Sequence, residues 1–197
     1  MKHTSERITP LQSGQSPFSE RVHSFLPYEE LTKNFGGVGK LNAHESPEEI
    51  FSLLGKIIKL VYSKVKKTNT YVDEHIWNLS SEELLSRGEV FYMNPCLEYS
   101  LLTLQYMKNA GFDSVNLIIN ELKTAYPNLY KLHFGLEGNH LGKTYFVDHA
   151  TRNTVHVGLG NFSSNYKDTT GEESVHTIVV DGNNISAKDS FPDLYKK

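Results

Sequence analysis

The first half of the chain carries apolar residues at helical spacing. From residue 46 to about residue 67 they recur every three or four positions and so share one face of a helix. Ser46 and Glu49 form a capping-box pair at its start, and Pro47 stands at the first helical position. A short helix is expected over residues 81–87, capped by Ser80 and ended by Gly88.

Beyond residue 111 the apolar residues alternate instead, which is typical of strands with one buried face. Alternation is clear over residues 115–119, 132–136 and 145–147, and residues 158–173 look like a loop. Residues 175–185 are expected to form a final hairpin around residues 181–184. Helices followed by strands predict an α+β fold in which N-terminal helices pack on an antiparallel β-sheet.

The chain has 197 residues, which suits one domain with tails. Residues 1–20 are polar and aperiodic and are expected to be a flexible arm, residues 21–190 a single domain, and residues 191–197 a tail. A Gly-rich segment at residues 36–41 lacks the glycine and the Ser or Thr of a phosphate-binding loop, because Asn34 and Leu41 stand at those positions. It is interpreted as a turn.

Composition excludes several classes of function. A net charge of −3 without a basic stripe gives no reason to expect a nucleic-acid partner. One cysteine excludes an internal disulfide framework and a cysteine-rich zinc site. The sequence shows neither a signal peptide nor a membrane span, so we expect a cytoplasmic protein without a membrane partner; its oligomeric state stays open.

The single cysteine, Cys96, stands where a nucleophile would be placed. Asn94 reads as a helix N-cap and Pro95 as the first helical residue, so Cys96 falls in the first turn of a helix that ends near Gly111. Unpaired N–H groups and the positive end of the helix dipole favour the thiolate there. The alternative is that Cys96 is a small buried apolar residue.

A histidine and an aspartate follow on predicted strands. A six-residue connection over residues 138–143 pairs Glu137 with Thr144 and therefore His133 with Asp148, on one sheet face. A five-residue connection would put them on opposite faces, and we predict the former. The neighbouring His149 is a competitor for Asp148, although its side chain should point to the other face.

A metal site is the rival interpretation. His133, His140, His149 and His156 lie close in sequence, but their spacings match no helical or short-loop ligand pattern. We therefore predict no metal and no cofactor.

Five segments together resemble the core of the transglutaminase-like superfamily: SSEELLSRG (80–88), NPCLEYSLL (94–102), NAGF (109–112), LHFGLE (132–137) and YFVD (145–148). The resemblance covers about residues 45–160 and implies a Cys-bearing helix against an antiparallel sheet that carries His and Asp. Asn94 replaces a glycine that is frequent two residues before the family's cysteine. Phe134 stands where the family often has a tryptophan.

These features predict a cysteine enzyme with a triad of Cys96, His133 and Asp148, which forms a thioester from an amide of a peptide, protein or small molecule. Hydrolysis, as in a peptidase or amidase, is preferred over acyl transfer. The backbone N–H of Cys96 is the expected first donor to the oxyanion. Candidates for the second donor or for substrate contact are Trp77, Asn78, Tyr92 and Tyr145. The alternative is a transglutaminase-like domain that binds proteins without catalysis.

Overall fold

The computed structural model describes residues 25–68, 81–91, 95–123, 130–151, 154–172 and 174–182. The helices of this part are α1 (Tyr28–Phe35), α2 (Pro47–Lys64), α3 (Ser81–Arg87), α4 (Pro95–Ala110) and α5 (Phe162–Thr170). The strands are β1 (Lys66–Thr68), β2 (Glu89–Phe91), β3 (Ser114–Lys123), β4 (Tyr130–His140), β5 (Lys143–Thr151), β6 (Thr154–Leu159) and β7 (Ser174–Asp181). The predicted arm at 1–20 and the predicted tail at 191–197 lie outside the described residues.

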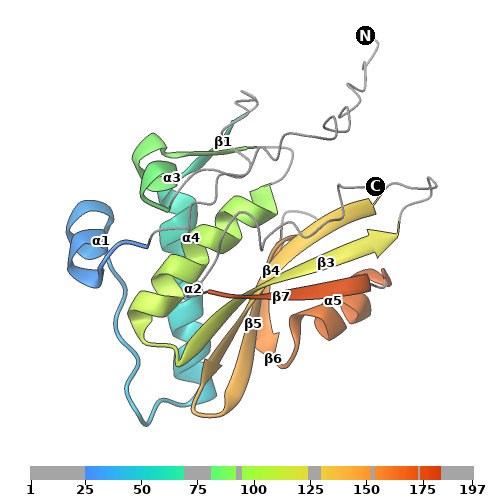
Figure 1. Cartoon of the computed structure of the whole chain (residues 1–197). Coiled ribbons are helices and arrows are strands. Elements are labelled where there is room, and N and C mark those ends of the chain that lie inside the picture. Colours follow the sequence, from blue (N-terminus) through green and yellow to red (C-terminus); the bar gives the residue numbers. More distant parts are fainter. Residues whose placement is uncertain are drawn as a thin grey trace.

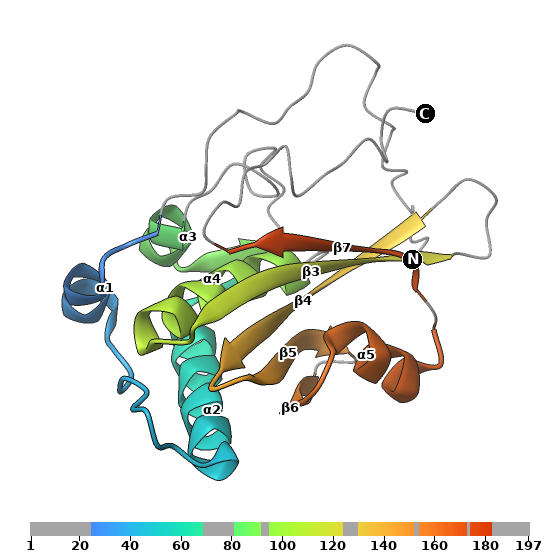
Figure 2. The same ribbon diagram turned by 60° about the horizontal axis from the view of Figure 1, so that its bottom comes forward.

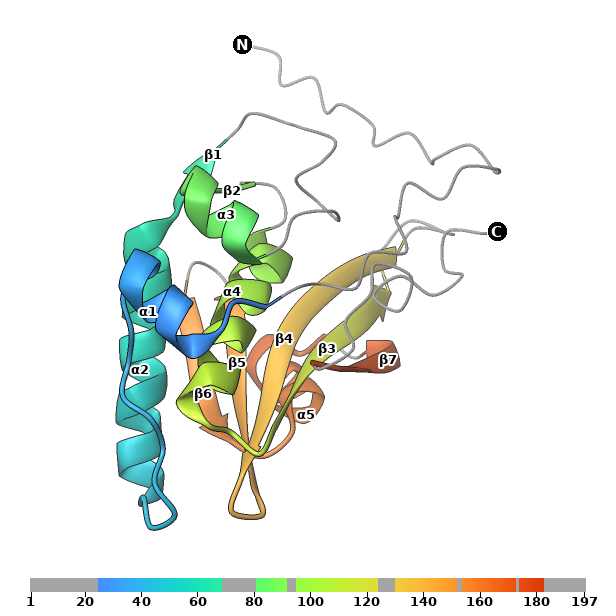
Figure 3. The same cartoon turned by 60° about the vertical axis from the view of Figure 1, so that its left-hand side comes forward.

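The main sheet has five strands in the order β6-β5-β4-β3-β7, and every neighbouring pair is antiparallel (Figure 1). Helix α4 packs on β3, β4 and β5, and α2 packs on the outer side of α4. Helix α5 lies on the opposite face of the sheet (Figures 2 and 3). The predicted α+β class with an antiparallel sheet is therefore confirmed.

Helix α2 begins as its sequence predicts. The Ser46 side chain accepts a hydrogen bond from the Glu49 backbone N–H, and the Ser46 N–H donates to the Glu49 carboxylate at 2.7 Å. The helix ends at Lys64, three residues before the expected end near residue 67. The reason is tertiary, because residues 66–68 pair as β1 with β2 in a small parallel sheet.

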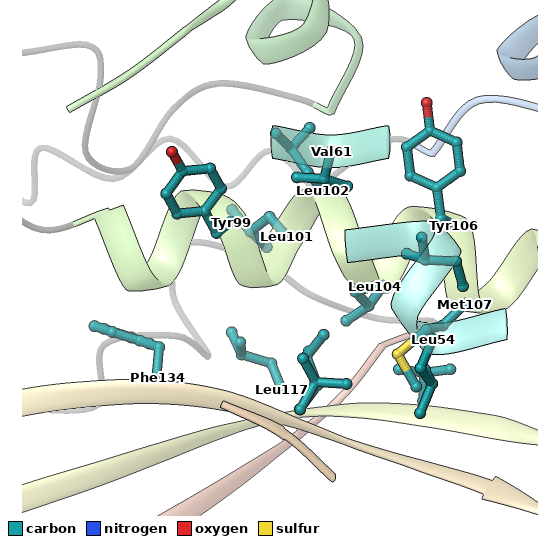
Figure 4. Packing of buried hydrophobic residues seen from close by; sticks show 14 of the residues in the cluster. Leu54, Val61, Tyr99, Leu101, Leu102, Leu104, Tyr106, Met107, Leu117 and Phe134 are labelled. Carbon is teal, nitrogen blue, oxygen red and sulfur yellow. The ribbon is translucent and has the colours of Figure 1, made fainter. Parts of the chain in front are cut away.

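Helix α4 is buried on nearly all sides, since it packs against the main sheet, α2, α3 and β2. Phe134 and Leu117 of the sheet point toward α4, whereas the hydroxyl groups of Tyr99 and Tyr106 point away from the sheet (Figure 4). The helical spacing of apolar residues in this segment predicts that Leu97, Leu101, Leu104 and Met107 point inward, and all four are buried.

The segment expected to be a loop at 158–173 contains α5, so that prediction was wrong. The Asn161 side chain caps this helix by accepting from the Ser164 N–H at 3.1 Å, and Gly171 ends it with a left-handed φ of 73°. Phe162 and Tyr166 project from α5 onto the sheet and form a second small core with Ile118, Leu122 and Phe146. The far face of the sheet is therefore covered as well.

The β4–β5 hairpin is tighter than predicted. His140 pairs with Lys143 across a two-residue connection, in which Leu141 and Gly142 have φ values of 50° and 73°. Glu137 pairs with Phe146 and not with Thr144, so the predicted register was wrong by two residues. A shift of two residues leaves every side chain on its predicted face, because strand side chains alternate with a period of two.

The first arm of the predicted final hairpin is strand β7, which pairs with β3 at one edge of the sheet, with Val180 opposite Leu117. The predicted return of the chain at residues 183–185 lies outside the described residues.

The close approach of α5 to the sheet predicts a specific sensitivity at Gly135. A Cβ at this position would overlap the ring of Phe162, so Gly135→Ala must displace this ring, which anchors α5 to the sheet. We expect the free energy of unfolding to fall by about 1–3 kcal/mol in urea titrations. Gly55→Ala is the matched control, because its Cβ meets nothing within 4 Å in the middle of α2. That variant should gain about 0.5–1 kcal/mol. Equal effects of the two substitutions would contradict the packing described for α5.

Candidate active site

The imidazole of His133 is hydrogen-bonded to the carboxylate of Asp148, with 2.7 Å between Nε2 and Oδ1. Both side chains are buried, with 6% and 0% of their surface exposed. Asp148 pairs directly with Gly135, so His133 is its diagonal neighbour on the same sheet face. The expected contact between His133 and Asp148 is thus present, although the two residues are diagonal neighbours and not directly opposite each other as predicted.

His133 lies where β4 and β5 stop pairing. The pair Gly135–Asp148 is the last one at this end of their ladder among the described residues, and β5 is irregular beyond Asp148 in its pairing with β6. Among the described residues, β5 forms no backbone pair with β4 beyond Asp148. We attribute the access of His133 to helix α4, which packs on the other face, to this end of the backbone pairing.

Cys96 is the second residue of α4, and its side chain is 5% exposed. Its side chain forms a hydrogen bond with the imidazole of His133. Because Nε2 is taken by Asp148, Nδ1 is the ring nitrogen that remains for the sulfur. The three side chains thus form a connected buried chain from the sulfur through the imidazole to the carboxylate. The predicted N-cap, Asn94, lies outside the described residues.

The surroundings of His133 favour its protonated form. Burial by itself lowers the pKa of His133, but the hydrogen bonds to Asp148 and Cys96 and the negative charges of both groups outweigh it and raise the pKa from 6.5 to about 9. The rings of Tyr166 and Phe162 stand 4.5 Å and 5.7 Å from the imidazole centroid and flank it. Aromatic faces attract a cation, so α5 adds to the same preference.

His149 points to the opposite face of the sheet, as predicted. Its Nε2 lies 2.8 Å from the hydroxyl of Thr103 on α4, and its Nδ1 lies 3.4 Å from the hydroxyl of Tyr62 on α2. Complete burial lowers the pKa of His149 to about 3; the nearby charge of Asp148 opposes this effect and that of His133 adds to it. His149 is therefore a neutral imidazole at physiological pH.

The remaining candidates divide into two groups. Tyr145 is 1% exposed and packs edge-on against Phe51 and Phe112, with ring centroids 5.7 Å and 6.4 Å away, so it belongs to the core. Trp77, Asn78 and Tyr92 lie outside the described residues, and their roles stay predictions.

Sequence reasoning missed three aromatic residues near the site, namely Tyr62, Phe162 and Tyr166. Tyr62 lies outside the buried apolar face of α2, and an aromatic residue at such a position indicates only weakly that it packs against another element. Phe162 and Tyr166 are four positions apart after the N-cap Asn161, a helix signal that their polar neighbours obscure.

In the part of the chain that the structure describes, no cluster of three or more His, Cys, Asp or Glu side chains is placed to bind a metal ion. None of the described helices combines the length and apolar character that crossing a membrane requires.

No known family model matches the chain, and no curated protein matches it. The functional inference therefore depends on the geometry of Cys96, His133 and Asp148.

The burial of His149 predicts a loss of stability in acid. The pKa of His149 is about 3 in the folded state, below its ordinary value of 6.5, so the stability that its neutral form contributes is fully present above pH 6.5. As the pH falls from 6.5 toward 3, His149 becomes protonated in the unfolded chain but stays neutral in the folded chain. Stability should then fall by up to about 1.4 kcal/mol per pH unit from this group.

Urea unfolding of the full chain at several pH values between 7 and 4 measures this dependence. His149→Gln keeps every carboxylate and removes only the titrating group, so its stability should depend less steeply on pH. Parallel curves for the two proteins would contradict the lowered pKa, because they would show that the folded chain protonates His149 as readily as the unfolded chain does.

Proposed function

We propose that this protein is a cysteine-dependent enzyme of the transglutaminase-like class that acts on an amide through a thioester on Cys96. The observation that carries the proposal is the buried imidazole of His133, which is hydrogen-bonded to both Asp148 and Cys96. A base next to a thiol, oriented by a carboxylate, is the arrangement that activates a cysteine nucleophile.

Each group has a distinct role in the proposed reaction. His133 takes the thiol proton, and the sulfur of Cys96 attacks the amide carbonyl carbon. The backbone N–H of Cys96, at the start of α4, donates to the resulting oxyanion. His133 then gives its proton to the leaving amine as the C–N bond breaks, and Asp148 holds the imidazole in orientation throughout.

Hydrolysis is the proposed fate of the thioester, with a peptide, a protein or a small amide as the substrate. Water is sufficient for this second step, and the sequence offers no feature that indicates a dedicated amine site. Transfer to an amine differs only in the nucleophile that attacks the thioester, because the triad serves both reactions.

The alternative, a binding module without catalysis, is less well supported. Burying a carboxylate and an imidazolium is costly unless the groups are paired, and a scaffold gains nothing from a histidine whose pKa is raised to about 9. Perturbed titrating groups in direct contact with a nucleophile are more typical of active sites.

Alkylation by iodoacetamide tests whether Cys96 is activated. At pH 7 we expect it to react about ten times faster than free cysteine, because only a small fraction of an ordinary thiol is ionised there. His133→Ala should abolish this advantage, since it removes the proton acceptor. His44→Ala is the control, because His44 is exposed in the turn before α2. Alkylation at the rate of free cysteine in the unmodified chain would favour the binding module.

The substrate class can be found with a panel of amide and thioester donors. Mass spectrometry should detect an acyl group on the Cys96 peptide with at least one donor, and Cys96→Ser should give no thioester. Rapid alkylation without any acyl adduct across the panel would argue against acyl chemistry.

A further inference from the structure

Tyr62 connects the two elements that carry Cys96 and Asp148. Its ring, on α2, stacks on that of Tyr99 with centroids 4.3 Å apart and an interplanar angle of 16°. Tyr99 follows Cys96 by three positions on α4, so the two share one side of the helix. The Tyr62 hydroxyl lies 3.4 Å from Nδ1 of His149, the residue after Asp148 in β5.

Tyr62 also differs from the triad residues in exposure. It is 37% exposed, whereas Cys96, His133 and Asp148 are all below 7%. Of these four residues, Tyr62 is therefore the one most accessible from solvent.

The hydroxyl of Tyr62 remains a hydrogen-bond donor at physiological pH. Partial burial is the main cause that raises its pKa to about 12, and the charges of Tyr99, Asp148 and Cys96 add to it. A group that resists ionisation beside a developing negative charge is suited to donate to it.

His149 can direct this hydroxyl. It is neutral, so one ring nitrogen carries a proton and the other accepts. When the Thr103 hydroxyl donates to Nε2, Nδ1–H donates to the Tyr62 oxygen, and the Tyr62 O–H is left free to donate elsewhere. In this network the fully buried His149, which is not part of the triad, orients the Tyr62 hydroxyl.

We propose that the Tyr62 hydroxyl donates the second hydrogen bond to the oxyanion formed at Cys96, and that His149 is the positioning residue that orients it. The inference rests on the proposed function, since it requires acyl chemistry at Cys96. It assigns the role of second donor to a residue of α2.

Two reactions of Cys96 separate an oxyanion donor from a group that merely supports the thiolate. With p-nitrophenyl acetate, the sulfur attacks the carbonyl carbon to give a tetrahedral oxyanion. Its collapse restores the C=O bond, breaks the C–O bond and releases p-nitrophenolate, while the thiol proton stays on His133. With iodoacetamide, the sulfur displaces iodide at a saturated carbon, and no oxyanion forms.

Tyr62→Phe should slow the acylation burst with p-nitrophenyl acetate by about 100-fold. Its rate of alkylation by iodoacetamide should stay unchanged. Tyr106→Phe is the matched control. It removes a buried hydroxyl of α4 that has no hydrogen-bond partner among the described residues. Both rates should be unchanged in that variant.

Equal loss of both reactions in Tyr62→Phe would overturn the proposal, since Tyr62 would then act on the thiolate. No loss of acylation would overturn it as well. Failure of the unmodified chain to be acylated is a separate result that overturns the proposed function and this inference with it.

The role of His149 is tested by non-additivity. His149→Phe should slow acylation as Tyr62→Phe does, and the double variant should be no slower than either single one. Additive losses would show that His149 acts independently of Tyr62 and is not its positioning residue.

Discussion

The hydrogen bond between His133 and Asp148 is the interaction on which the candidate site depends. It joins two adjacent strands at the point where their backbone pairing ends, and it lies out of contact with water. Taking both groups out of solvent is unfavourable unless they satisfy each other, so each fixes the position of its partner. With Nε2 held by Asp148, the ring has one nitrogen left for Cys96.

The rest of the fold places groups around this bond from both faces of the sheet. Helix α5 covers one face and brings Phe162 and Tyr166 against the imidazole, which the absence of a side chain at Gly135 permits. Helices α4 and α2 cover the other face and bring Cys96 and Tyr62. Among the described residues, the backbone pairing of β4 with β5 ends at Gly135 and Asp148, and the candidate site lies at this end of the two strands.

Much of this arrangement could be predicted from sequence because it follows from local signals. The capping box at Ser46 fixes the start of α2, and the alternation along β4 fixes which residues share a face. The sheet face to which a strand residue points changes only when the register shifts by an odd number of residues. His133 and Asp148 were therefore expected on one side of the sheet even though the predicted hairpin connection was too long.

Other features depend on contacts that no local signal reports. The tight turn puts Leu141 at a positive φ, a conformation that a leucine in the sequence does not indicate. Helix α5 has only two apolar anchors in its polar sequence, and it is stabilised by the sheet that it covers. Tyr62 joins the site because α2, α4 and β5 meet in space, a relation that residue spacing along the chain does not contain.

The most direct test of the central claim is the titration of His133 in the full-length chain, followed by NMR with labelled histidine. The signal can be assigned through its loss in His133→Gln. We expect a pKa of about 9 for His133 and a clear decrease of this pKa in both Cys96→Ala and Asp148→Asn. A pKa near the ordinary value of about 6.5, unchanged by either substitution, would contradict it.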